Sequence, residues 1–298
     1  MAKGISIHLG LNLVDPGHYD GWDGALRACE ADASDMAKIA KERGYAATTL
    51  LLTRDATADR FKQAMQDAAG KLAAGDILFL SYSGHGGQVP DRDGDDEVDG
   101  LDETWCLYDR QLIDDELYAL FGKFAKGVRI VLLSDSCHSG TVARNAELSG
   151  QTVGELAAKL AASANALPQV RNGTLEPFGG YRLAPRQITF AAYARNRAMY
   201  EKLQKADGKA QAKAAAGRIG AGIVLISGCQ DNQLSSDGER NGLFTAMLEI
   251  VYDGGAYAHG YRRFHREIRG LMPPEQTPNL FLTGRTLAGF VTQVPFAI

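Results

Sequence analysis

Runs of apolar residues alternate along this chain with segments in which apolar residues recur every three or four positions. Continuous runs such as DILFLSYS and RIVLLSDS are typical of parallel strands buried on both faces. Thr57 suits a helix N-cap, and Gly44 suits the position after a helix C-terminus. The predicted strands are Gly4–Leu13, Ala46–Leu52, Asp76–Ser83, Val128–Ser134, Gln187–Ala192 and Ile223–Ser227, and the predicted helices are Trp22–Arg43, Thr57–Leu72, Asp114–Phe124 and Leu243–Tyr252. This alternation predicts an α/β fold whose mainly parallel central sheet is flanked by helices.

Composition adds that residues 1–298 form one domain of ordinary globular character. Apolar residues make up 45% of the chain and charged residues 23%. A formal net charge of −4 argues against a nucleic-acid or membrane partner. We find no signal peptide and no apolar run long enough to span a bilayer. The four cysteines form no CxxC pair, which excludes zinc-finger spacing and fits a reducing compartment. We therefore expect a cytoplasmic monomer.

Two predicted strands end in unusual polar clusters. The strand LFLSYS passes directly into Gly84-His85-Gly86-Gly87, and IVLLSDS passes into Cys137-His138-Ser139-Gly140. The carboxyl ends of parallel strands are where open α/β sheets place their active sites. A thiolate is a nucleophile, an imidazole can take the thiol proton, and glycines leave backbone N–H groups accessible to an oxyanion. The two clusters together predict cysteine-based nucleophilic catalysis.

His85 and Cys137 each also have a plainer interpretation. A buried cysteine is often only a small apolar side chain, and a lone strand-end histidine is often a surface residue. A metal hydrolase would need His85, Cys137, His138 and Cys229 to converge as ligands, and it would leave the glycine pattern unexplained. The pairing of both residues on glycine-flanked strand ends favours catalysis.

The motifs YSGHGGQ (82–88) and SDSCHSG (134–140) resemble those of metacaspases, the caspase-like peptidases of bacteria, plants, fungi and protists. The separation of about 50 residues between histidine and cysteine is the one noted for caspases. The helix with Cys29 and Asp32, the acidic stretch 93–103, IDDELY (113–118) and SGCQDNQ (227–233) extend the resemblance.

The resemblance implies a caspase-like three-layer fold, with Cys137 as nucleophile and His85 as general base. It implies that the N–H groups of Gly86 and Cys137 bind the oxyanion. It also implies a substrate pocket for the P1 residue, the residue before the cleaved bond. The pocket residues carried over by the resemblance are Asp32, Ser83 and Asp135.

Charge favours a cysteine endopeptidase that cuts after Arg or Lys. Asp135 stands two positions before the nucleophile, where a carboxylate would repel a P1 aspartate and pair with a basic side chain. Two alternatives stay open. One is a catalytically silent caspase-like module that binds or regulates. The other is a caspase-fold peptidase with a different P1 preference, such as an asparagine-cutting legumain-like enzyme.

The chemistry requires no cofactor, but calcium is a candidate activator. The loop Asp91–Glu103 holds eight carboxylates, a hard-oxygen composition that suits calcium, although it lacks EF-hand spacing. Many metacaspases need calcium, and the family's third ligand position is occupied here by Arg144, a cation. Alternatively, the loop is only solvated. The candidate metal ligands are Asp99, Asp102, Asp114 and Asp115.

Residues 141–222 are predicted to be an insertion or linker between the large and small parts of the domain. The Lys/Ala-rich run 200–218 suggests an exposed helix or a flexible linker. The sharper hypothesis is a self-cleavage segment, because several basic residues in it would suit the predicted pocket. These are Arg144, Arg171, Arg182, Lys205 and Lys213. The C-terminal PPEQTPNLFLTG is predicted to be extended and to carry no chemistry.

Overall fold

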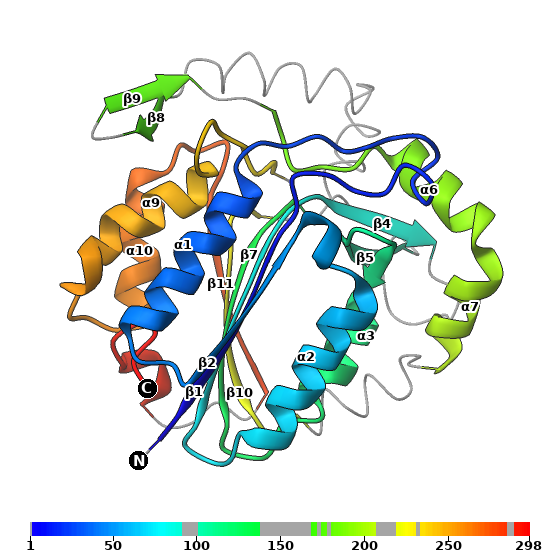
Figure 1. Cartoon of the computed structure of the whole chain (residues 1–298). Helices are drawn as coiled ribbons and strands as arrows, with labels where there is room; N and C mark the ends of the chain where they lie inside the picture. Colours follow the sequence, from blue (N-terminus) through cyan, green and yellow to red (C-terminus); the bar gives the residue numbers. More distant parts are fainter. Residues whose placement is uncertain are drawn as a thin grey trace.

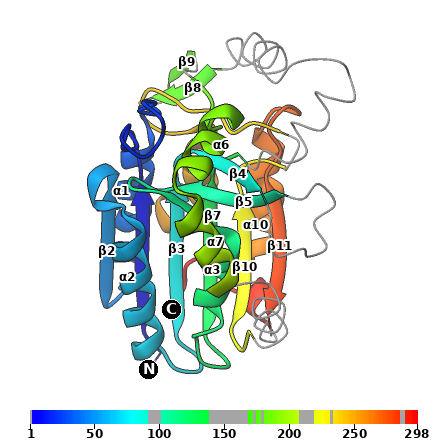
Figure 2. The same cartoon turned by 90° about the vertical axis from the view of Figure 1, so that its right-hand side faces the viewer.

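A computed structural model of the chain describes residues 2–90, 101–137, 168–171, 174–177, 180–206, 219–230, 233–284 and 289–298. Its centre is a six-stranded sheet in the order β11-β10-β7-β3-β1-β2. All neighbours in it are parallel except β10 and β11. Figure 2 shows the strands side by side, from β2 at one edge to β11 at the other. Their bounds are β1 Gly4–Gly10, β2 Ala47–Leu52, β3 Ile77–Ser83, β7 Arg129–Asp135, β10 Gly222–Ser227 and β11 Asn279–Gly284.

Helices cover both faces of this sheet (Figure 1), which makes the three layers that the sequence predicts. Helices α1 (Cys29–Glu42), α9 (Leu243–Tyr252) and α10 (Tyr261–Leu271) lie on one face. Helices α2 (Ala58–Lys71) and α3 (Asp114–Phe121) lie on the other. Thr57 caps α2 as predicted, since its side chain accepts a hydrogen bond from Arg60 N.

Strand alternation builds a separate core on each face. In β3, Leu78 and Leu80 belong to the cluster with α2 and α3, whereas Ile77 and Phe79 pack with α1, α9 and α10. Because successive strand side chains point to opposite faces, an apolar run without polar interruptions serves both cores. Every residue of β3 and of β7 is buried.

A smaller three-stranded sheet stands at the carboxyl ends of the main strands. It consists of β4 (Gly86–Pro90), β5 (Leu101–Cys106) and β6 (Gln111–Ile113), paired antiparallel. Two helices pack outside it, α6 (Arg186–Arg195) and α7 (Arg197–Ala206) (Figure 2). A two-stranded sheet, β8 (Pro168–Arg171) with β9 (Thr174–Pro177), and the short 3-10 turns η1 (Thr53–Asp55), η2 (Asp253–Gly255) and η3 (Phe290–Thr292) complete the described elements.

Two predicted elements differ most from the structure, one in kind and one in extent. Gln187–Ala192 is part of helix α6, because Thr189, Ala192 and Tyr193 recur at helical spacing and bury one side of it. The helix predicted over Trp22–Arg43 begins only at Cys29, since the preceding chain turns through Gly21 and Gly24 at positive φ. The predicted extended C-terminal segment is confirmed only over its second half, which is β11, whereas residues 274–276 form a turn.

The predicted linker is partly packed against the domain. Tyr200 of α7 is fully buried, stacks on Tyr193 and accepts a hydrogen bond from Gln111 N, so this part of the Lys/Ala-rich run is not an exposed helix. Of the predicted linker, residues 141–167 and 207–218 lie outside the described residues.

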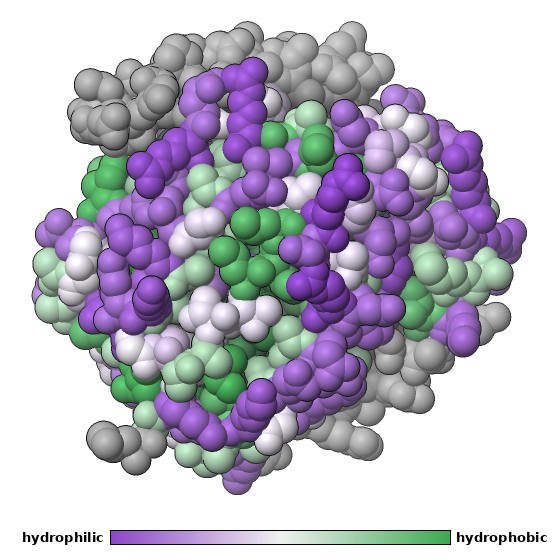
Figure 3. Space-filling model, viewed as in Figure 1, coloured by the Kyte–Doolittle hydropathy of each residue, from purple (hydrophilic) through white to green (hydrophobic). Residues whose placement is uncertain are grey.

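An apolar patch lies on the surface away from the predicted site residues that the structure describes. Apolar side chains reach the surface between α1 and α2, over edge strand β2 (Figure 3), where Leu50 is 38% exposed. No helix in the described part of the chain is long and apolar enough to cross a bilayer.

Candidate active site

The two polar clusters lie side by side at the carboxyl ends of adjacent strands. Strands β3 and β7 pair in parallel, and their register sets Ser83 opposite Asp135. His85 and Cys137 each follow two residues later, so the chain brings both predicted catalytic residues to one edge of the sheet. Both are buried.

His85 is held as a neutral base. Its Nε2 lies 2.9 Å from Gly24 O, and because a carbonyl only accepts, Nε2 carries the proton. The buried Nδ1 makes no hydrogen bond to any residue that the structure describes, and it is the nitrogen that can accept a proton. Burial lowers the pKa of His85 to about 4, an effect that the Gly24 carbonyl partly opposes. Trp22 packs beside the ring, with 4.8 Å between the ring centroids.

Cys137 is not hydrogen-bonded to His85 in this structure. Its Sγ accepts the N–H of Ser235 at 2.8 Å and lies 3.7 Å from Ser235 O. Proton transfer to Nδ1 of His85 therefore requires the thiol to rotate away from Ser235. Such contacts often tighten only when substrate is bound.

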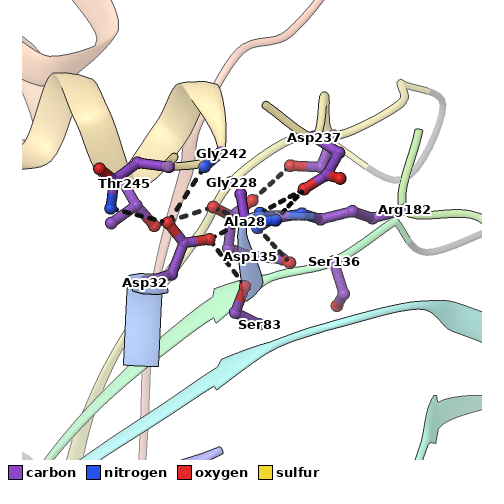
Figure 4. A network of polar contacts seen from close by, with 12 residues as sticks. Ala28, Asp32, Ser83, Asp135, Ser136, Arg182, Gly228, Asp237, Gly242 and Thr245 are labelled. Atoms are coloured by element: carbon purple, nitrogen blue, oxygen red, sulfur yellow. Dashed lines mark hydrogen bonds and ion pairs between the residues drawn. The ribbon is translucent and has the colours of Figure 1, made fainter. Parts of the chain in front are cut away.

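The three residues predicted for the P1 pocket converge (Figure 4). Ser83 donates to the Asp32 carboxylate at 2.8 Å. Asp135 lies beside them at the end of β7, and all three are at least 97% buried. A buried carboxylate needs a cation or several donors, because desolvation penalises its charge.

The cation is Arg182, whose guanidinium fills the space between the carboxylates (Figure 4). Its side chain is completely buried. Nη2 lies 2.6 Å from Asp32 Oδ2, and Nη1 lies 2.7 Å from Asp135 Oδ2. Arg182 is one of the five basic linker residues that were predicted to suit this pocket, and the structure places its side chain in the pocket.

Asp237 is a third pocket carboxylate that sequence reasoning missed. Its Oδ1 lies 3.1 Å from Nη2 of Arg182, and the carboxylate also accepts the N–H groups of Arg27 and Ala28, just before α1. It stands in a loop 100 residues after Cys137 with no motif around it. Only the turn-rich composition of SSDGER marks the loop, so the sequence offered no signal for this role.

Hydrogen bonds from residues 235–245 orient these carboxylates. Asn241 and Gly242 donate to Asp32, and Ser235 and Thr245 donate to Asp135. Burial raises the pKa of Asp32 to about 6, an effect that the Arg182 charge opposes. The positive charge of Arg182 thus favours the ionised form of Asp32.

The C-terminal segment, which was expected to carry no chemistry, holds a neighbouring loop of the site in place. Gln276, just before β11, is buried and accepts the N–H of Ser236 at 3.0 Å. It donates to Gly228 O and to the hydroxyl of Ser235. Gln276 therefore positions the loop that contacts both Cys137 and Asp135.

The two N–H groups predicted to bind the oxyanion point at one oxygen. Gly86 N and Cys137 N lie 3.1 and 3.2 Å from the carbonyl oxygen of Arg182. A Cβ at position 86 would stand 1.7 Å from Cys137 O, so only glycine permits this approach.

The candidate calcium ligands are only partly described. Asp102 lies on β5 and accepts from Gln204 Nε2 at 2.7 Å, while Asp114 and Asp115 begin α3. Within the described ranges, no three His, Cys, Asp or Glu side chains are arranged to hold a metal ion. Asp99 and Arg144 lie outside those ranges, so calcium binding stays a prediction.

His8 on β1 is a second buried histidine, and it makes stability depend on pH. Its Nδ1 lies 2.8 Å from Ser81 Oγ, and burial lowers its pKa to about 3, against about 6.5 in an unfolded chain. Its stabilising contribution is therefore complete above about pH 6.5 and is lost as the pH falls toward 3. In urea unfolding, the parent should lose unfolding free energy as the pH falls from 7 to 5. His8→Gln should lose about 2 kcal/mol less than the parent over the same pH range.

The control for this prediction is His259→Gln, at an exposed position before α10, which should leave the loss unchanged. Because each variant is compared with the parent, other titrating groups cancel. The same loss in His8→Gln as in the parent would contradict the assignment.

Comparisons with known proteins agree with this geometry. The family model "Caspase domain" matches residues 13–289. A metacaspase-1 from Mycosarcoma maydis is 30% identical over 254 residues, and one from Schizosaccharomyces pombe is 31% identical over 255. Each alignment covers 79% of this chain but only 59% and 57% of those relatives, so the chain spans less than two thirds of their length.

A solved structure is also similar over nearly the whole chain. Protein GSU0716 from Geobacter sulfurreducens is 49% identical, with a TM-score of 0.82. The match covers 99% of this chain and 98% of that one.

Proposed function

Since this chain belongs to the caspase-domain family and is a homologue of metacaspases, we propose that it is a cysteine endopeptidase that cleaves after Arg or Lys. Cys137 acts as the nucleophile and His85 as the general base. Asp32, Ser83 and Asp135 form the P1 pocket together with Asp237. Its substrates are proteins or peptides.

One observation supports the basic preference above all others. Three buried carboxylates surround the guanidinium of Arg182. The main-chain carbonyl oxygen of the same residue accepts the N–H groups of Gly86 and Cys137. A P1 arginine needs both contacts at once: its side chain in a charged pocket and its carbonyl in an oxyanion hole. An aspartate in the same place would face like charges and leave the pocket without a cation.

In the reaction, His85 accepts the Cys137 proton at Nδ1, and the thiolate attacks the P1 carbonyl. Negative charge that develops on the carbonyl oxygen is stabilised by the N–H groups of Gly86 and Cys137. His85 then returns the proton to the leaving amine, and water releases the acyl group. These steps need no metal.

A fluorogenic peptide panel that differs only at P1 tests the proposal. Peptides with Arg or Lys should be cut, whereas those with Gln, which lacks the charge, or Asp should stay nearly intact. Efficient cleavage after Asp would refute the pocket assignment. A folded protein that cuts no peptide at all would favour a silent binding module.

The same panel, run with calcium and with a chelator, tests the proposed activation. Activity that disappears in chelator and returns with calcium would point to Asp102, Asp114 and Asp115, with Asp99, as the carboxylates that the ion gathers. Equal rates in both conditions would rule out calcium control.

A further inference from the structure

The loop that joins β1 to α1 passes over the carboxyl ends of the central strands (Figure 1), and two of its residues contact the catalytic histidine. Gly24 O accepts the hydrogen bond from Nε2 of His85 at 2.9 Å. The indole of Trp22 lies beside the imidazole, with 4.8 Å between the ring centroids and 54° between the ring planes. The carbonyl orients the imidazole by a hydrogen bond, whereas the indole meets it as an apolar surface.

The indole covers one particular edge of the imidazole. A Cβ added to Gly24 would stand 3.0 Å from Cη2 of Trp22 and 3.2 Å from Cδ2 of His85, so these two atoms and the Gly24 backbone meet at one point. Cδ2 is bonded to Nε2, and Nδ1 lies on the other side of the ring. Gly24 has a φ of +58°, and a side chain there would press on both rings. The Nε2 edge is therefore enclosed, and Nδ1 is left for the proton of Cys137.

Packing within the loop holds Trp22 in this place. Its main-chain N–H donates to Tyr19 O at 3.0 Å, and the two aromatic rings make an edge contact. Tyr19 is fully buried, and its hydroxyl donates to Leu107 O, which anchors the loop to the chain just after β5. Trp22 is only partly buried, so part of its indole reaches solvent while another part contacts His85. The indole thus stands between the catalytic base and bulk water.

We propose that Trp22 is a positioning residue for this reaction, whose indole keeps water from the Nε2 edge of His85 and thereby holds the imidazole in its neutral form as the base for Cys137. The proposal rests on the proposed function. An apolar side chain beside an imidazole disfavours its charged form, because the imidazolium loses hydration there. Only a neutral imidazole can accept a proton, so the shield keeps the base competent at mildly acidic pH.

The charges around His85 do not by themselves account for its neutral form. Burial lowers the pKa of His85 to about 4, while the charges of Asp237 and Arg182 act on the ring in opposite directions. Two other titratable groups lie nearby in the described chain, the buried thiol of Cys137 and the exposed carboxylate of Asp23 in the same loop. None of these groups changes when the indole alone is replaced. Attraction between an imidazolium and the indole would have the opposite effect to shielding.

The pH dependence of kcat/KM for a P1-arginine peptide, measured in calcium, tests the proposal. Loss of the indole should raise the pKa of His85 toward its usual value of 6.5, and a protonated His85 cannot take the proton of Cys137. Relative to the parent, Trp22→Ala should therefore lower the ratio of kcat/KM at pH 5 to that at pH 7.5 by about two- to tenfold. Trp22→Phe keeps an apolar ring and should restore the parental ratio.

The ratio separates shielding from a structural role. A substitution that only loosens the loop lowers activity at every pH alike and leaves the ratio unchanged. Phe281→Ala, which removes a 43% exposed aromatic ring from edge strand β11, is the matched control and should keep the parental profile. Thermal unfolding at each pH shows whether a variant is folded. Should Trp22→Ala not fold, Trp22→Gln puts a polar side chain beside the imidazole and should lower the ratio in the same way.

Nuclear magnetic resonance of isotope-labelled histidines measures the same property without substrate. The His85 signal, identified by its loss in His85→Ala, should titrate at a higher pH in Trp22→Ala than in the parent. If the parent cuts arginine peptides and Trp22→Ala keeps both the ratio and the titration, the inference is overturned and the proposed function stands. A profile that moves to lower pH also overturns the inference. If the parent cuts no peptide, the proposed function fails, and the titration of His85 still decides whether Trp22 shields the ring.

Discussion

Cys137→Ala is expected to lower kcat/KM for a P1-arginine peptide by at least about 10⁴-fold while leaving the protein folded. The substitution removes the atom that forms the covalent intermediate, and no other described thiol replaces it. Cys106 is buried, and burial raises its pKa to about 12, so it has almost no thiolate at neutral pH. The measurement is steady-state hydrolysis, with thermal unfolding as the check on folding.

His85→Ala should cause a loss of similar size, and the double variant should lose little more than either single one. Residues that act as one unit fail together. Cys106→Ala and His259→Gln, which change the same residue types elsewhere, should retain the parent rate. Substantial turnover by a folded Cys137→Ala protein would sink the mechanism.

Removing the charge of a pocket carboxylate should cost activity on basic substrates selectively. Asp135→Asn is expected to reduce kcat/KM for P1-arginine peptides by roughly 10- to 1,000-fold, the size of a lost charge-assisted contact. Asp237→Asn should lower kcat/KM for these peptides by about tenfold or more. The Asp237 carboxylate lies 3.1 Å from the Arg182 guanidinium, which Asp135 also contacts, so it should contact a P1 arginine in the same way. The measurement is kinetics on peptides that differ only at P1.

Asp67→Asn provides the matched control for these variants, since it removes a carboxylate from an exposed position of α2. It should change no kinetic constant. If Asp135→Asn and Asp67→Asn behave alike on arginine peptides, the carboxylates do not form the P1 pocket. An effect of Asp135→Asn without one of Asp237→Asn would remove only Asp237 from the pocket.

The buried strands and the meeting of His85 and Cys137 at one edge of the sheet were predictable because their signals are local. An apolar run such as ILFLSYS lacks the polar positions of an amphipathic helix or a half-exposed strand, so it predicts a buried strand. The parallel pairing of two such strands brings their carboxyl ends together. Their continuations, GHGG and CHSG, therefore had to meet at one edge. Asp32 and Ser83 entered through the family resemblance, and the structure brings them within 2.8 Å.

The parts that were missed depend on tertiary contacts. The sequence QITFAA has β-branched and aromatic residues that suit a strand, but packing of Ala192 and Tyr193 holds it as helix α6. Asp237 and Gln276 acquire their roles only through hydrogen bonds to residues far away in the chain. No local pattern records such partners.

The seating of Arg182 also has a consequence for the response of the site to salt. Its guanidinium is 0% exposed and contacts the buried carboxylates of Asp32, Asp135 and Asp237. Salt screens charges that are exposed to solvent far more than it screens buried ones. The ion pairs that hold Arg182 should therefore persist at an ionic strength that weakens surface pairs such as Arg197–Glu201.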